Sequence, residues 1–144
     1  MRIERSTHIA APVDSVFAFV SDPRNDPAWC PKIRSVEQQS RSGSGPGTRY
    51  LVLHRPIPVL ATRSMDYVLV SWDPPHRIEW HEDDGHDRIT VTYTLESAEG
   101  GTRFTQSDDA ELGAPRFMHP LMRAGIGRDI AAQLERLRQH LEGA

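Results

Sequence analysis

Apolar and polar residues alternate along much of the chain, and this pattern is typical of β-strands with one covered face. The clearest case is residues 89–95, where four apolar residues alternate with three threonines. Weaker alternation predicts further strands at residues 2–10, 32–39, 48–55, 62–72 and 102–109, and one around Ile78 and Trp80. Turns rich in glycine or proline separate these segments, so we expect an antiparallel sheet of about seven strands.

A second periodicity predicts helices. After Pro12, apolar residues recur at helical spacing from Val13 to Val20, which indicates a short amphipathic helix. The prolines of residues 23–31 then leave room for at most a one-turn helix.

The only long helical pattern covers residues 116–141. Pro120 lies inside it, so the regular helix is expected to begin there, after a looser turn. Its apolar seam consists of Phe117, Leu121, Ala124, Ile130, Leu134, Leu137 and Leu141.

One strand, two short helices, about six antiparallel strands and a long C-terminal helix define an α+β fold. The sheet must bury one face, and the long helix is the element able to cover it. The 144 residues match the commonest size of a domain, so we expect a single domain over residues 1–144.

Composition narrows the function classes. The formal net charge of −3 and the pI near 6.1 provide no positive field for phosphates, so nucleic acid is not an expected partner. No run approaches the roughly 20 apolar residues of a membrane span, and the N-terminus lacks a signal-like core, so we expect a cytoplasmic protein. The single cysteine, Cys30, is expected to be a half-buried thiol beside Trp29.

Familiar catalytic and metal motifs are missing from the sequence. The segment HEDDGH (residues 81–86) spaces its histidines five apart, whereas the zincin motif needs them four apart on a helix, so a hairpin tip is expected. Nucleophile-elbow, P-loop and dinucleotide-binding motifs are also missing. We therefore expect neither a metal nor a cofactor.

Four segments carry a resemblance to a known family: IAAPVDSVFAFVSDPRNDPAW (9–29), GPGTRY (45–50), YVLVSWDPPHRIEW (67–80) and GGTRFTQ (100–106). With the C-terminal helix, they resemble the START-like superfamily of helix-grip proteins, in particular its polyketide cyclase/dehydrase and lipid-transport group. The resemblance implies a curved sheet that grips the long helix, with a cavity between them edged by the short helices and loops. Ligand carriers and aromatic cyclases share this scaffold, so the resemblance alone does not choose an activity.

Several polar side chains are expected to point inward with apolar neighbours, among them Arg5, His54, Glu82 and Asp108. Such positions are costly unless the group contacts a ligand or another buried group, and an ion pair from Arg5 to Glu82 or Asp108 is the structural alternative. On the helix, large flexible side chains alternate with Gly125 and Gly127, which suits either a cavity border or a kinked core. The expected ligand-binding residues are Arg5, Trp29, Tyr50, His54, Tyr67, Trp80, Glu82, Tyr93, Phe104, Asp108, Phe117, Met118, Leu121 and Met122.

Three functions remain open. The first is a carrier or sensor of a small hydrophobic molecule, such as a lipid, polyketide or aromatic metabolite, in a monomer or homodimer. The second is a polyketide cyclase or dehydratase, in which His54 moves protons while Arg5 or Tyr67 polarises a ketone. The third is an interaction module, because homologues of heat-shock-chaperone activators resemble this fold.

Overall fold

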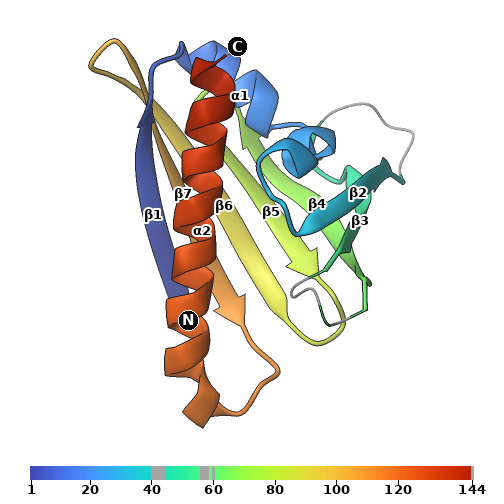
Figure 1. Cartoon of the computed structure of the whole chain (residues 1–144). Helices are drawn as coiled ribbons and strands as arrows, with labels where there is room; N and C mark the ends of the chain where they lie inside the picture. Colours follow the sequence, from blue (N-terminus) through green and yellow to red (C-terminus); the bar gives the residue numbers. More distant parts are fainter. Residues whose placement is uncertain (40–44, 56–58, 60, 144) are drawn as a thin grey trace.

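Seven antiparallel strands form one sheet in the order β1-β7-β6-β5-β4-β3-β2 (Figure 1). The computed structural model describes residues 1–39, 45–55, 59 and 61–143. After β1 the chain crosses to the far edge of the sheet and then returns strand by strand until β7 lies beside β1. The strands are β1 (Arg2–Ile9), β2 (Ile33–Gln38), β3 (Arg49–His54), β4 (Arg63–Asp73), β5 (Arg77–Asp83), β6 (Arg88–Ala98) and β7 (Gly101–Glu111).

The expected seven strands are therefore confirmed. Residues 40–44, 56–58 and 60, which the sequence assigns to turns, lie outside the described residues. The HEDDGH segment forms the end of β5 and the turn into β6, as expected for a hairpin tip. Within that turn Gly85 has a φ of 85°, a conformation that side chains rarely adopt.

Two short helices connect β1 to β2. Helix α1 (Val13–Val20) buries Val16, Phe17 and Val20, as its spacing predicts. It is followed by a 3₁₀ helix, η1 (Pro23–Ala28), which is longer than the single turn expected from the prolines. The Asp22 side chain stabilises its start by accepting a hydrogen bond of 3.0 Å from the backbone N–H of Arg24.

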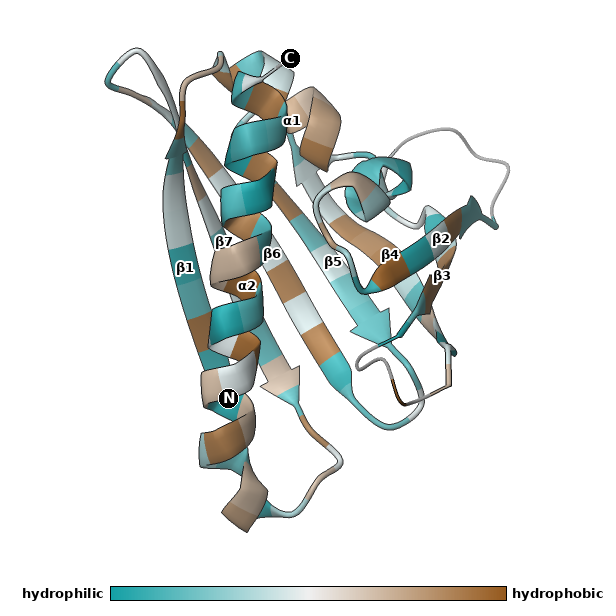
Figure 2. Cartoon of the chain, in the orientation of Figure 1, coloured by the Kyte–Doolittle hydropathy of each residue, from teal (hydrophilic) through white to brown (hydrophobic). Residues whose placement is uncertain are grey.

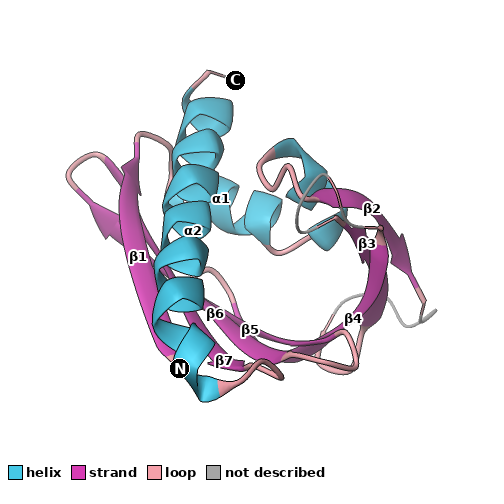
Figure 3. Cartoon of the chain, turned by 60° about the horizontal axis from the view of Figure 1, so that its bottom comes forward, coloured by secondary structure: helices cyan, strands magenta, loops and turns pink. Residues whose placement is uncertain are grey.

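The long helix α2 (His119–Glu142) follows a short 3₁₀ turn, η2 (Arg116–Met118), so the expected delay of the regular helix until Pro120 is confirmed to within one residue. Helix α2 lies across the concave face of the curved sheet (Figure 3). It buries Ile130, Leu134 and Leu137.

The first part of the predicted seam is wrong. Phe117 is 83% exposed and Leu121 is 75% exposed, and Ala124 is exposed too. Figure 1 shows the reason: the first turns of α2 extend beyond the end of β1, so no sheet lies opposite them.

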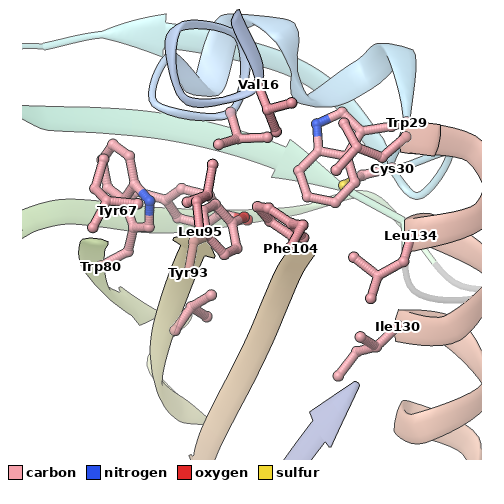
Figure 4. Packing of buried hydrophobic residues seen from close by; sticks show 14 of the residues in the cluster. Val16, Trp29, Cys30, Tyr67, Trp80, Tyr93, Leu95, Phe104, Ile130 and Leu134 are labelled. Atoms are coloured by element: carbon pink, nitrogen blue, oxygen red, sulfur yellow. The ribbon is translucent and has the colours of Figure 1, made fainter. Parts of the chain in front are cut away.

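The core lies between the sheet and the helices. Strand residues alternate in hydropathy, most visibly along β6 (Figure 2). At its centre Trp29 packs against Tyr93 and Phe104, with ring centroids 6.0 and 6.3 Å away, and Ile130 points toward this group from α2 (Figure 4). This aromatic group fixes the position of η1 against the sheet.

Candidate functional site

A cavity of about 290 Å³ lies between α2 and the concave face of the sheet. Helix α2 contributes Met122, Ile126 and Ile130 to its wall. The facing wall comes from the strands of the sheet, whose alternation directs every second side chain inward. Its apolar strand residues include Ile33, Met65, Ile89 and Val91.

The register of the strands brings polar groups into this apolar surface. Asp108 pairs with Val91, Gln106 pairs with Tyr93, and Glu82 pairs with both Tyr67 and Ile89. Asp26 reaches the same cavity from η1. The cavity wall is therefore mixed, with aromatic rings, a carboxamide and three carboxyl groups set among aliphatic side chains.

Asp108 is the best-defined of these acids. It is 8% exposed, and its Oδ1 accepts a 3.0 Å hydrogen bond from Nε2 of Gln106. Burial raises its pKa from 3.8 to about 6, although the Gln106 hydrogen bond acts in the opposite direction. Asp108 therefore titrates near neutral pH.

Glu82 and Asp26 are perturbed in the same direction. Burial raises the pKa of Glu82 well above its ordinary value, and the charges of Asp108 and Asp26 raise it further. The surface that Glu82 keeps accessible lines the cavity. Burial also raises the pKa of Asp26 well above the usual range, with a contribution from Asp22.

Two acceptor oxygens in this group have no hydrogen-bond partner among the described residues. They are Oδ1 of Asp26 and Oε1 of Gln106, and each residue is 5% exposed. A buried acceptor without a donor costs roughly 1–3 kcal/mol. The indole N–H of Trp29 lies close enough to Asp26 to lower the pKa of its carboxyl as a hydrogen-bond donor. Gln106 lines the cavity, so its oxygen is the one that a ligand donor could satisfy.

Four further titratable groups in the cavity wall are shifted toward their uncharged forms. Burial raises the pKa of Tyr67, of Tyr93 and of the Cys30 thiol well above their ordinary values. Burial lowers the pKa of His54, whose Nε2 is buried without a partner among the described residues. These groups can donate or accept hydrogen bonds without carrying charge.

At the edge of the cavity, Lys32 forms an ion pair of 2.5 Å with Asp129 of α2. Asp84 accepts hydrogen bonds from the backbone N–H groups of His86 and Asp87, and Asp87 accepts one from the backbone of Gly113. The edge is thus acidic but well hydrogen-bonded.

The structure divides the expected ligand-binding residues into four groups. The first group, buried in the core, consists of Trp29, Trp80 and Phe104. Tyr50 lines a separate hollow of about 340 Å³ beside Asp22 and Arg24. Arg5, Phe117, Met118 and Leu121 lie on the surface. The cavity is lined by His54, Tyr67, Glu82, Tyr93, Asp108 and Met122.

Arg5 does not neutralise the buried acids. Its Nη1 donates to the backbone oxygen of Glu4 at 2.7 Å, and its guanidinium lies against Gly127 of α2, where a side chain would collide with it. The ion pair with Glu82 or Asp108, which the sequence left open as the structural alternative, does not form among the described residues. Gly127, which has no side chain, thus leaves room for the guanidinium of Arg5 against α2, outside the cavity.

Sequence reasoning missed Asp26, Cys30 and Gln106. Gln106 had a usable signal, because it lies on the same face of β7 as Phe104 and Asp108. Asp26 had none: it stands between two prolines in a segment that resembles a solvated turn, and Trp29 draws that segment into the core.

Among the described residues, no group of three or more His, Cys, Asp or Glu side chains is arranged to hold a metal ion. Nor does that part of the chain contain a helix that is long and apolar enough to cross a membrane.

A family model described as polyketide cyclase / dehydrase and lipid transport matches residues 1–142. The chain belongs to this family. A search of curated proteins found no match.

Solved structures of the same fold cover nearly the whole chain. TTHA0849 from Thermus thermophilus is 18% identical with a TM-score of 0.81, over 98% of this chain and 97% of that one. Ara h 8.0201 is 14% identical with a TM-score of 0.75, over 100% and 99%. The di-domain ARO/CYC StfQ from the steffimycin biosynthetic pathway is 12% identical with a TM-score of 0.76, over 99% of this chain and 50% of that one. At these identities the likeness establishes the helix-grip fold.

Proposed function

We propose that this protein binds a small hydrophobic molecule in the cavity between α2 and the sheet, as a carrier or sensor. The observation that carries the proposal is the cavity of about 290 Å³ itself. Other hollows on the surface are at least as large, but this one lies between α2 and the sheet and has the most apolar wall among them. It is close to the lower end of the roughly 300–1,000 Å³ range of small-molecule pockets.

The wall has the composition that such sites need. Met122, Ile126 and Ile130 present an apolar surface on one side, and a few polar groups converge on the other. In ligand pockets the apolar surface supplies most of the binding free energy, and the polar groups fix orientation. Membership of a family whose description includes lipid transport supports the same proposal.

A second candidate is acid–base catalysis on a molecule held in the same cavity. It is favoured by Asp108, whose pKa of about 6 suits proton transfer near neutral pH. Tyr67 also lies in the cavity and could donate a hydrogen bond to a ketone, whereas Arg5 lies outside it. If the protein is a cyclase, it will convert poly-β-keto substrates and Asp108→Asn will abolish turnover. Absence of turnover together with tight binding of an unreactive lipid would eliminate this candidate.

Binding can be tested with a neutral fluorescent dye such as prodan and by native mass spectrometry of the purified protein. We expect saturable dye binding, or a co-purified small molecule that dye displaces. Ile126→Trp would fill the cavity and should abolish the signal. Ala131→Trp places the same side chain on an exposed position of α2 and should leave binding intact. Equal binding by both variants, or no binding by the wild type, would refute the proposal.

A further inference from the structure

The cavity and its edge carry far more negative than positive groups. Six carboxyl groups line it, and the only lysine or arginine among the lining residues is Lys32. Lys32 is already paired with Asp129. Arg5 lies against Gly127 outside the cavity, and Arg63, which acts electrostatically on His54 and Asp84, does not line it either. The acidic residues concerned are Asp26, Glu82, Asp84, Asp87, Asp108 and Asp129.

Burial raises the pKa of three of these acids, Asp26, Glu82 and Asp108, and the charges of Asp26 and Asp108 raise that of Glu82 further. None of the three forms an ion pair with a basic side chain in the described part of the chain. Buried charges are normally paired, because removing a charge from water without compensation is very costly. Burial instead raises the pKa of all three acids, so they hold their protons more strongly than exposed carboxyl groups, and a cationic ligand would favour their ionised form.

The unpartnered side-chain oxygen of Gln106 provides independent evidence of a missing donor. Oε1 of Gln106 has no hydrogen-bond partner among the described residues, and Gln106 is only 5% exposed and lines the cavity. Gln106 already uses its amide nitrogen to donate to Asp108, so its oxygen is left to accept from another group. A ligand that supplies hydrogen-bond donors would complete the site.

The chemistry of the missing group follows from these two observations. An anionic head group would oppose the ionisation of these acids, and a purely apolar ligand would leave the oxygen of Gln106 unpaired. A metal ion does not fit, because the described acids are not arranged as ligands. A protonated amine brings a positive charge and up to three donors, and the rings of Tyr67 and Tyr93 in the same wall favour a cation as well.

We propose that the ligand is an amphipathic molecule with a protonated amine, which seats its ammonium group among Asp26, Glu82, Asp108 and Gln106 and its apolar part against α2. This inference rests on the proposed ligand-binding function and specifies the class of molecule. The protein should then select ligands by their charge as well as by their apolar surface.

Three ligands with the same apolar body test it: 2-(1-naphthyl)ethylamine, 2-(1-naphthyl)ethanol and 1-naphthylacetate. Their affinities are measured at pH 7.5 by isothermal titration calorimetry and by displacement of prodan. We expect the amine to bind at least about tenfold more tightly than the alcohol, and the carboxylate to bind more weakly than either.

The variant Glu82→Gln/Asp108→Asn removes two of the acids while keeping their shape. It should bring the affinities of amine and alcohol to within about threefold of each other, chiefly by weakening the binding of the amine. Asp109→Asn, on the exposed face of β7, is the matched control and should keep the full preference.

Two results would overturn the inference: equal binding of amine and alcohol by the wild type, or a preference for the amine that persists in the double variant. In either case saturable binding of the alcohol would leave the proposed function standing. If none of the three ligands nor prodan binds, both proposals fall.

Discussion

Replacing Asp108 with asparagine should stabilise the protein at neutral pH. Asp108 is buried beside Glu82, which lies in the same acidic group, and its one hydrogen bond comes from Gln106. Asparagine has nearly the same shape and retains an Oδ1 that can accept that bond. The substitution therefore removes the cost of a buried ionisable group without creating a void.

The magnitude follows from the pKa. Between about pH 4 and pH 6, Asp108 holds its proton in the folded state and has lost it in the unfolded state. The folded state then binds more protons, so the free energy of unfolding of the wild type falls as pH rises through this window. A rise from 3.8 to about 6 corresponds to about 3 kcal/mol, at about 1.4 kcal/mol for each pKa unit.

Urea denaturation at pH 8 and at pH 4 measures the effect. We expect Asp108→Asn to raise the free energy of unfolding by up to about 3 kcal/mol at pH 8 and by less than about 1 kcal/mol at pH 4. Asp109→Asn, whose side chain is 70% exposed, should change it by no more than about 0.5 kcal/mol at either pH. A destabilised Asp108→Asn at pH 8, or a gain that does not depend on pH, would refute the reasoning.

Three further predictions concern the frame around the cavity. Gly125→Ala should stabilise the protein by up to about 1 kcal/mol in urea denaturation, because open space surrounds this helical position. Gly101→Ala should destabilise the protein, because the added carbon would collide with the backbone oxygen of Ile9. Leu137→Ala, at a fully buried position of α2, should cost about 2–5 kcal/mol in the same assay, and a smaller loss would show that α2 packs loosely. Burial raises the pKa of the Cys30 thiol, so Cys30 should react with iodoacetamide at pH 8 far more slowly in the native protein than in urea. Mass spectrometry follows the reaction, and equal rates would contradict the placement of Cys30 in the cavity wall.

Local patterns in the sequence were enough to establish most of the fold. The period-two run of residues 89–95 and the helical spacing of Val13 to Val20 were correct, because alternation and helical repeats reflect which face of an element is buried. Pro120 correctly marked the start of the long helix, since proline fits the first turn of a helix and disrupts its interior. The same patterns identified Glu82 and Asp108 as inward-facing acids.

Only the tertiary structure decided which inward-facing residues meet at one place. Phe117 and Leu121 continue the apolar seam of α2 in the sequence, yet they are exposed because the helix extends beyond the sheet. Arg5 has the periodicity of an inward residue, but the space beside Gly127 keeps its charge away from the acids.

Asp26 joins Glu82 and Asp108 only because the packing of Trp29 carries η1 over the sheet. The sequence thus determined the elements and the face that each one buries, since those depend on neighbouring residues. The cavity and its unpaired acids depend on how far the sheet curves and where α2 crosses it, and these follow from contacts between residues distant in the chain.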